Sequence, residues 1–278
     1  MRWSAHLEEK IAKFCLWLVA IITLVVLINI VIHILINGVS ALSWSYFTED
    51  PRRMGKEGGI FSIIIGTLYL TFAGVILATP IGVGSAIYLT EYVKEGRLVR
   101  IIRFGTEALA AIPSIIFGLF GFVLFVITLG MGWSILSGAL TLAFMILPTI
   151  IRAAEEAIKT VPDSYREGSL ALGATKWYTI RKVVLPSALP GIATGIILGI
   201  GRAIGETAAV ILTAGSSLGI PTSLMDPTRT LAVHLYILAS EGLSMEKAYA
   251  SATVLIVLIL IINFLAHKLM SRLVGRVS

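Results

Sequence analysis

Long runs of apolar residues, separated by short polar or glycine-rich segments, dominate the chain. A helix rises about 1.5 Å per residue, so about 20 apolar residues cross the ~30 Å hydrocarbon core of a membrane. Each run is long enough or nearly so, and the pattern predicts an all-α, polytopic membrane protein with six transmembrane helices. The predicted spans are Phe14–Ile36, Ile60–Leu89, Phe104–Thr128, Ile135–Ile151, Pro190–Ala214 and Tyr249–Ala266.

Composition agrees with this class of protein. The 278 residues are 57% hydrophobic and 14% charged, and the mean hydropathy is +0.94. These values leave too little polar surface to cover a soluble domain of this length. No charge run or low-complexity tract divides the chain, so residues 1–278 are predicted to form a single transmembrane domain. The first apolar run is too long for a cleaved signal peptide, and no small-x-small cleavage site follows it.

The positions of lysine and arginine predict the orientation. If the N-terminus is inside, 16 of the 22 lysines and arginines lie on the cytoplasmic side and five lie outside, as the positive-inside rule requires. Both termini and the loop 152–189 are therefore predicted to be cytoplasmic. The outward segments are Asn37–Gly59 and Ser216–Lys247, and the second is predicted to hold a short or re-entrant helix near Leu231–Ala239. The net charge of +6 follows from this topology and requires no nucleic-acid partner.

Motifs for nucleotide, metal or covalent chemistry are missing from the sequence. There is no G-x-x-x-x-G-K-S/T loop and no H-E-x-x-H, and the four histidines are dispersed. The single cysteine, Cys15, excludes a disulfide within the chain. We therefore predict a transport subunit rather than an enzyme, with no catalytic residue, no metal site and no cofactor bound by the chain itself. Its energy must come from an ion gradient, a substrate gradient or a separate ATPase.

The loop 152–189 carries the pattern of two short helices. Ser164 and Glu167 have the spacing of a capping box, which predicts that the first helix begins at Ser164. Gly173 follows the last apolar position of this helix, and glycine ends a helix at low cost because it readily adopts the left-handed conformation.

The second helix of the loop is predicted to begin near Thr175 and to stop at Leu185-Pro186, because proline lacks the amide that an interior position needs. It presents Trp177 and further apolar residues on one face. That face needs a cover, which is either the inner end of the bundle itself or the groove of a soluble partner.

The fifth span combines small residues with two charges. A helix turns about 100° per residue, so one sector of about 80° around its axis holds five residues of this span: Gly191, Gly195, Gly199, Arg202 and Glu206. Glycines at this spacing let another helix approach closely, and an intramembrane charge costs at least ~2.5–3.5 kcal/mol unless it faces protein or water. The shared face is therefore predicted to point away from lipid.

Two interpretations of the charges remain open. In the first, Arg202 and Glu206, one turn apart, form a buried ion pair that only fixes the register of the helix. In the second, the planar guanidinium of Arg202 binds a passing oxyanion through two hydrogen bonds, and Glu206 prevents permanent capture. Arg152, at the inner end of the fourth span, is predicted to be an interfacial anchor or a further residue of the anion path.

The loop also carries a resemblance to a known family. Glu167-Gly168-Ser169, Gly173 and Val183-Val184-Leu185-Pro186 keep the spacing of the EAA motif of ATP-binding-cassette (ABC) importer permeases. The sequence departs from that motif at Gly168 and Ser169, where alanine is preferred, and at Val183, where isoleucine is preferred. The resemblance implies a type I importer permease (MetI-like) fold in which Ser164–Leu185 forms coupling helices that dock on a cytoplasmic ATPase. The residues implied in ATPase coupling are Ser164, Glu167, Gly173, Trp177, Leu185 and Pro186.

A second set of segments narrows the resemblance. A resemblance to the phosphate-specific branch of these permeases lies in two segments, Ala111–Gly121 and Gly201–Ala208. The PstA type of subunit is the most similar, and the PstC type is next, over two further segments, Ala209–Gly215 and Leu231–Tyr236. This resemblance implies half of a phosphate pathway in a prokaryotic inner membrane. The implied partners are a PstC-like second permease, a cytoplasmic ATPase dimer that uses ATP and Mg, and an external phosphate-binding protein. A permease for molybdate or sulfate, and an ion-coupled carrier, remain as alternatives.

Overall fold

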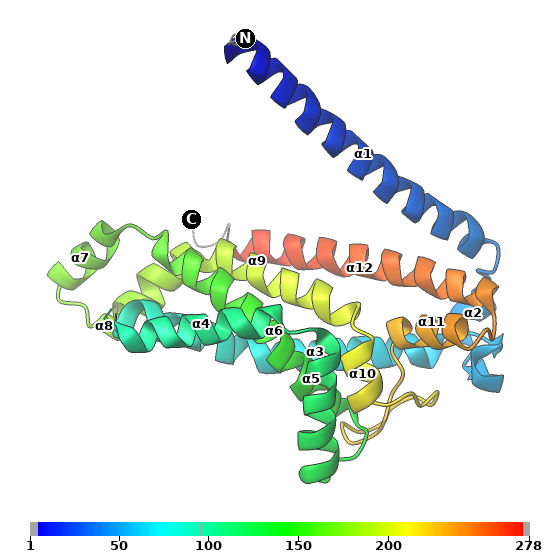
Figure 1. Ribbon diagram of the computed structural model, residues 1–278. Coiled ribbons are helices and arrows are strands. Elements are labelled where there is room, and N and C mark those ends of the chain that lie inside the picture. Colours follow the sequence, from blue (N-terminus) through cyan, green and yellow to red (C-terminus); the bar gives the residue numbers. More distant parts are fainter. Residues whose placement is uncertain (1–4, 95, 275–278) are drawn as a thin grey trace.

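The computed structural model describes residues 5–94 and 96–274 (Figure 1). Arg2 and Arg276, two of the basic residues counted above, lie outside the described residues. Most of the described chain is helical, and the predicted all-α fold class is confirmed. The α-helices are α1 (Ala5–Val39), α2 (Trp44–Thr48), α3 (Phe61–Ile87), α4 (Arg97–Ala111), α5 (Ser114–Gly121), α6 (Ile135–Lys159), α7 (Asp163–Ala171), α8 (Lys176–Thr179), α9 (Leu185–Ile204), α10 (Ala208–Thr213), α11 (Leu231–Ser240) and α12 (Met245–Val274).

Shorter elements extend or connect these helices. The 3-10 turn η1 (Arg53–Gly55) separates two short strands, β1 (Pro51–Arg52) and β2 (Glu57–Gly58), which pair antiparallel with Pro51 opposite Gly58. Three π-helical turns lengthen neighbouring helices: η2 (Tyr88–Tyr92) follows α3, η3 (Phe122–Thr128) follows α5, and η4 (Ile180–Val184) joins α8 to α9.

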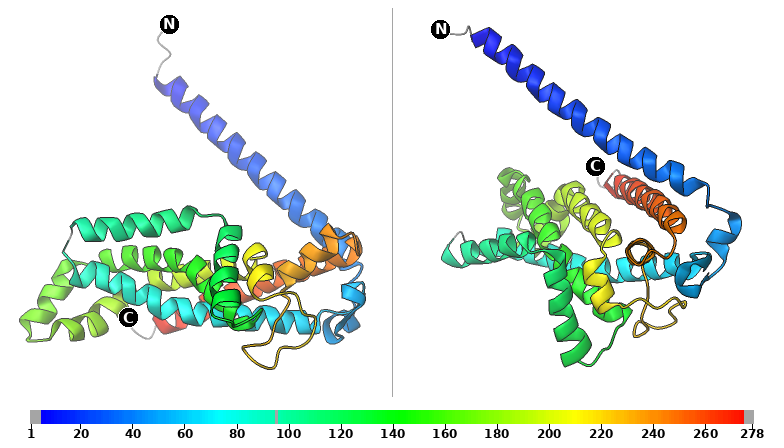
Figure 2. Two further views of the ribbon diagram at one scale, coloured as in Figure 1. Left: turned by 60° about the horizontal axis from the view of Figure 1, so that its bottom comes forward. Right: turned by 45° about the vertical axis from the view of Figure 1, so that its right-hand side comes forward.

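Within the described residues, five helices are long and apolar enough to cross a membrane, and a bent pair makes a sixth span if it is counted as one. α6 lies at the centre, packed against both α3 and α9, and α3, α6, α9 and α12 run side by side (Figures 1 and 2). Leu142, Ile146 and Ile150 recur at helical spacing on α6 and are fully buried. The core of the bundle is therefore built around this helix.

α6 also continues beyond the predicted end of the fourth span at Ile151. The buried face of the helix extends for two more turns, through Ala154 and Ile158. Two glutamates between them lowered the local hydropathy: Glu156 is exposed, whereas Glu155 is buried together with the apolar residues. The predicted loop 152–189 is therefore shorter, and only residues 160–184 separate α6 from α9.

The first helix stands apart from the bundle. α1 diverges from α12 towards its N-terminal end (Figure 2), and the two helices touch near Gly38, whose position lies against Thr253 and the backbone of Tyr249. The 18-residue apolar window of α1 has none of its residues buried. Only lipid or another membrane protein can cover such a surface in a bilayer.

The predicted third span, 104–128, is broken. α4 ends at Ala111, and the helix that begins at Ser114 is bent by 101° relative to it. Pro113 is the reason, because a residue that precedes proline disfavours the helical conformation, and Ile112 is extended. The predicted third span is therefore a bent pair of helices, α4 and α5 with η3, rather than one straight helix.

The two ends of the bundle differ. One end carries α7 and α8, and the other carries α2, the small strand pair and α11 (Figure 1). α11 confirms the short helix expected near Leu231–Ala239. Thr230 caps it by accepting a hydrogen bond from the Val233 amide at 3.4 Å.

Candidate functional site

The fifth predicted span is also broken. α9 ends before Gly205, and α10 begins after a short non-helical turn. Glu206 lies in this turn, where its Oε1 accepts a hydrogen bond from the Ala209 amide at 3.2 Å. A carboxylate is favourable there, because the first amides of a helix lack intrahelical partners. The prediction that Arg202 and Glu206 lie one turn apart on a continuous helix is therefore wrong.

Arg202 lies in the last turn of α9, beside this break, and is partly buried. Among residues 5–94 and 96–274, its guanidinium has no hydrogen-bond or ion-pair partner, and Glu206 does not pair with it. The ion-pair interpretation of these two residues is thus not what the structure shows. A partly buried arginine in mid-span keeps its whole donor fork available to a ligand or to another subunit.

The glycines of α9 lie against α6, the central helix. They let the two backbones approach closely, because a side chain at any of the three positions would contact α6. Gly191 lies against Ala157, Gly195 against Ala153 and Gly199 against Ile150. Arg202 follows on the same side of α9, so the helix that carries it is held tightly against the centre of the bundle.

The second halves of the two broken spans pack against each other. α5 packs against α10, and a Cβ added at Gly118 would lie 2.7 Å from the Cα of Ala209. Gly121, one turn further along α5, lies against Thr141 of α6 and Thr213 of α10. Both half-helices leave the bundle axis together (Figure 1), and Arg202 lies just before the break that separates α10 from α9.

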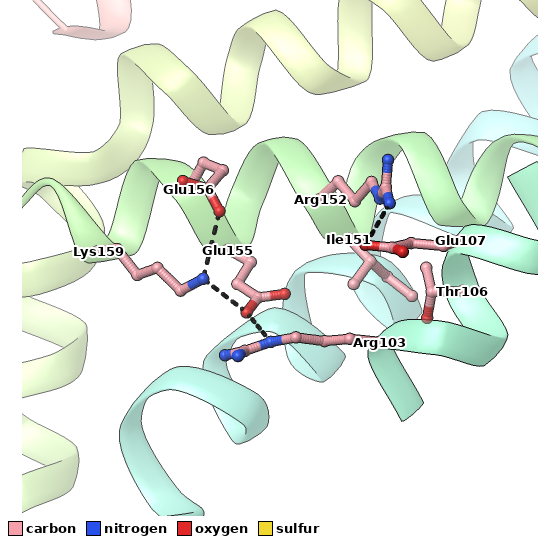
Figure 3. Close-up of a pocket in the computed structure, with 8 residues that line it drawn as sticks. All are labelled: Arg103, Thr106, Glu107, Ile151, Arg152, Glu155, Glu156 and Lys159. Carbon is pink, nitrogen blue, oxygen red and sulfur yellow. Dashed lines mark hydrogen bonds and ion pairs between the residues drawn. The ribbon is translucent and has the colours of Figure 1, made fainter. Parts of the chain in front are cut away.

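A charged pocket of about 330 Å³ opens between α4 and α6, towards the end of the bundle that carries α7 and α8 (Figure 3). Arg103 donates from Nε to Glu155 at 2.6 Å, and Lys159 contacts the same carboxylate at 2.9 Å. Glu155 is only 6% exposed, and two cations compensate the cost of burying its charge. The pocket is lined by Arg103, Thr106, Glu107, Ile151, Arg152, Glu155, Glu156 and Lys159.

Arg152 lies at the open side of this pocket. Its Nη2 is 2.7 Å from Oε1 of Glu107, and both side chains are about half exposed. The structure thus places the predicted anchor or path residue in an exchangeable ion pair between α4 and α6, because an exposed pair contributes at most ~1 kcal/mol. Lining cations and carboxylates are equal in number, so the pocket has no net positive charge.

The α7–α8 hairpin, Asp163–Thr179, has the expected two-helix form. Gly173 has φ +82°, its amide donates to Leu170, and the next amide donates to the Ser169 carbonyl. These bonds form a Schellman motif, which confirms that Gly173 ends the first helix. Thr175 caps α8 by accepting from the Tyr178 amide at 3.3 Å.

Two details of the hairpin were predicted wrongly. α7 begins at Asp163 with Pro162 as its extended N-cap residue, so Ser164 is already helical and the capping box with Glu167 does not form. Leu185-Pro186 does not stop the second helix, because the π-helical turn η4 leads directly into α9 and the proline falls in the first turn of that helix.

The apolar face of the hairpin is divided between two environments. Ile180 and Val184 are buried against the bundle. Leu172 is 91% exposed at the tip, Trp177 and Tyr178 are each 55% exposed, and a pocket of about 510 Å³ lies around Gly173. The bundle therefore covers only part of this face, and the tip is left for a partner.

At the opposite end of the bundle, Arg229 and His234 hold the loops in place. Arg229 is 4% exposed and donates to the carbonyls of Ser216 at 3.0 Å and Met54 at 3.4 Å. His234 is 1% exposed and packs against Gly55, where an added Cβ would lie 2.5 Å from the ring. Burial first, then the charges of Arg229 and Lys247, lower the pKa of His234 from 6.5 to about 3.

We predict that acid destabilises this end of the bundle through His234. The unfolded chain binds a proton on this ring below about pH 6.5, whereas the folded chain does so only near pH 3. The free energy of unfolding therefore falls as the pH drops through this window. His234→Gln does not titrate, so its thermal midpoint should fall less than that of the wild type between about pH 7.5 and about pH 5. Equal falls in both proteins would contradict this role.

Comparison with known proteins agrees with the geometry. Residues 78–278 match the family described as binding-protein-dependent transport system inner membrane component. The chain belongs to this family. It is 34% identical over 282 residues to the probable ABC transporter permease protein YqgI of Bacillus subtilis, covering 96% of each chain. It is 36% identical over 259 residues to the phosphate transport system permease protein PstA 1 of Mycobacterium tuberculosis, covering 91% of this chain and 84% of that protein.

Solved structures show the same fold. The permease chain of a bacterial ABC importer of alginate matches with a TM-score of 0.67 at 16% identity, over 96% of this chain and 99% of that one. A chain of the MetNI methionine transporter in an inward-facing conformation matches with a TM-score of 0.61 at 22% identity, over 77% and 93%. The predicted MetI-like importer permease fold of a multi-pass inner-membrane protein is thus confirmed.

Sequence analysis did not identify several residues of the site. Glu155 and Glu91 are buried carboxylates whose arginine partners, Arg103 and Arg166, are far away in the chain. No spacing rule connects such pairs. The only available signal was that Glu155 interrupts an otherwise apolar helical face, which requires a compensating partner.

Proposed function

We propose that this chain is the PstA-type permease of an ATP-driven importer of inorganic phosphate and that it supplies half of the translocation pathway. The observation that carries the proposal is the unpaired Arg202 beside the break between α9 and α10. Irregular backbone does not face lipid within a membrane, because its polar groups would lack hydrogen-bond partners. The surface around Gly205, which is exposed in the single chain, therefore faces water or a second permease.

The chemistry of Arg202 suits an oxyanion. Its planar fork suits two parallel hydrogen bonds to the oxygens of a phosphate. Broken spans near the middle of a bundle are a recurring way to place binding groups in a membrane transporter. Relatives named phosphate transport system permease proteins in Mycobacterium tuberculosis and Haemophilus influenzae support phosphate as the anion.

The α7–α8 hairpin supports coupling to a separate ATPase. Its exposed tip around Leu172 and Gly173 needs an apolar cover, and its Glu167, Gly173 and Leu185-Pro186 keep the coupling-motif spacing. We place this end of the bundle in the cytoplasm, because most lysines and arginines lie there. α12 ends on the same side as the hairpin (Figure 1), which supports a cytoplasmic C-terminus.

One chain supplies one hairpin and one Arg202, so the complete pathway requires a second permease. We infer a PstC-like partner across the surface formed by the two broken spans, two cytoplasmic ATPase subunits that use ATP and Mg, and an external phosphate-binding protein. Closure of the ATPase pair moves the α7–α8 hairpin, and this movement switches the bundle between inward-facing and outward-facing states.

Competition between oxyanions tests the substrate. Membrane vesicles that contain the complete transporter should take up radiolabelled phosphate in the presence of ATP, and unlabelled phosphate should compete far better than sulfate or molybdate. Vesicles with the transporter but without the phosphate-binding protein serve as the control. Preferential uptake of sulfate or molybdate would contradict phosphate as the substrate.

A further inference from the structure

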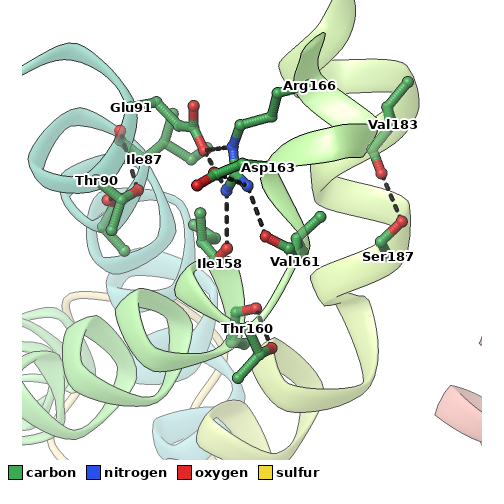
Figure 4. A network of polar contacts seen from close by, with 12 residues as sticks. Ile87, Thr90, Glu91, Ile158, Thr160, Val161, Asp163, Arg166, Val183 and Ser187 are labelled. Carbon is green, nitrogen blue, oxygen red and sulfur yellow. Dashed lines mark hydrogen bonds and ion pairs between the residues drawn. The ribbon is translucent and has the colours of Figure 1, made fainter. Parts of the chain in front are cut away.

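We propose that Arg166 and Glu91 form a strut that transmits movement of the α7–α8 hairpin directly to α3. The inference rests on the proposed function, since it assigns a role within coupling. Arg166 donates to one oxygen of Glu91 from Nε at 3.0 Å and from Nη2 at 2.8 Å (Figure 4). Arg166 belongs to α7 and Glu91 to η2, the turn that ends the α3 span. The pair joins segments 75 residues apart in the sequence.

The same guanidinium also donates hydrogen bonds to backbone carbonyls at the end of α6. Nη1 donates to the Val161 carbonyl at 2.6 Å, and Nη2 donates to the Ile158 carbonyl at 2.9 Å. Carbonyls at a helix C-terminus lack intrahelical partners, and an arginine there satisfies them. One side chain therefore connects α7, α6 and η2.

Burial distinguishes this contact from a surface ion pair. The Arg166 side chain is 19% exposed and that of Glu91 is 8% exposed, so water screens their attraction little. Asp163 provides a comparison in the same place. It contacts Nη1 of Arg166 at 3.2 Å but is 88% exposed, and an exposed pair of this kind contributes little.

A second contact links the hairpin to the same turn. The ammonium group of Lys176, the first residue of α8, lies 5.0 Å from the centre of the Tyr92 ring in η2. Ser169 and Thr179 hydrogen-bond at 2.8 Å and hold α7 and α8 together. Both helices of the hairpin therefore contact η2, and they move against it as one unit.

The position of η2 explains why the contact matters. α6 and α9 continue into the hairpin through the chain itself, whereas α3 has no such connection. α3 packs along α6 over much of its length, and a π-helical turn is a frequent site of local adjustment in a helix. The Arg166–Glu91 pair connects the hairpin directly to α3 as well. As a result, α3 moves together with α6 and α9 and does not slide against them.

Removing the carboxylate tests the strut. In proteoliposomes with the complete transporter, Glu91→Ala should lower the phosphate transported per ATP hydrolysed by about 5-fold or more, while the complex still assembles and hydrolyses ATP. Glu91→Gln keeps an oxygen acceptor and should give a smaller loss. Asp163→Asn is the matched control and should keep the wild-type ratio. A wild-type ratio in Glu91→Ala, or an equal loss in Asp163→Asn, would overturn the proposal.

Hydrogen exchange gives a second readout that does not depend on the transported anion. Binding of a non-hydrolysable ATP analogue should change amide exchange in Tyr88–Tyr92 of the wild-type complex and should change it much less in Glu91→Ala. The same change in both proteins, or none in the wild type, would overturn the strut. A wild-type complex that shows this change but no ATP-dependent phosphate uptake would contradict the proposed function alone.

Discussion

Replacing Arg202 with lysine is expected to reduce phosphate uptake by about 10- to 100-fold without loss of the assembled complex. Lysine keeps the positive charge but presents a compact ammonium group instead of a planar fork. A hydrogen bond to a charged group contributes about 1.5–3 kcal/mol, which corresponds to the expected range in rate. Assembly should persist, because no described group of this chain pairs with the Arg202 guanidinium.

Uptake of radiolabelled phosphate by vesicles with equal amounts of purified complex provides the measurement. Arg100→Lys is a suitable control, since Arg100 is an exposed arginine of α4 at the end of the bundle, and it should transport normally. If Arg202→Lys also transports normally, two-point recognition of the anion is wrong and only a general positive field remains.

Replacing Leu172 with aspartate is expected to separate the permease from its ATPase. Leu172 is 91% exposed at the tip of the α7–α8 hairpin. Burying a leucine side chain in a partner contributes about 1.5–3 kcal/mol, and a buried unpaired carboxylate adds a further penalty, so binding should weaken by about 100-fold or more. Phosphate uptake should be lost with it.

Co-purification of the ATPase with affinity-tagged permease measures this association. Leu172→Met preserves the apolar volume and should retain the ATPase, which separates a lost contact from a misfolded hairpin. Normal recovery of the ATPase with Leu172→Asp would show that the tip of the hairpin is not the docking surface.

Local sequence signals predicted the features that depend on a few neighbouring residues. Gly173 ends α7 because no other residue adopts the left-handed conformation so cheaply, and this requirement is visible in the sequence. The short helix α11 was also predictable, since apolar residues follow a capping threonine, Thr230. The motif spacing of the hairpin then indicated the family that residues 78–278 match.

The breaks in the third and fifth spans were harder to predict, because the residues on both sides of each break are apolar. A hydropathy profile shows how long an apolar segment is, but it does not show that the helix bends at Ile112-Pro113 or ends before Gly205. Proline and glycine occur in many continuous membrane helices, so neither residue decides the question alone. Here Pro80, within α3, leaves its helix unbroken.

Long-range ion pairs could not be predicted at all. Arg166 was assigned to the loop 152–189, and Glu91 follows the end of the second predicted span at Leu89, so only the fold brings the two together. The correction with the greatest effect concerns Glu206, which caps α10 rather than pairing with Arg202. This single contact changes Arg202 from half of a structural pair into the candidate anion-binding group.

Reconstitution tests the central claim most directly. Proteoliposomes with the two permeases, the ATPase and the phosphate-binding protein should accumulate phosphate against its gradient only when ATP is supplied on the ATPase side. Omission of the ATPase, or a non-hydrolysable ATP analogue, should abolish accumulation. Phosphate transport by this chain alone, driven by an ion gradient without ATP, would contradict the account.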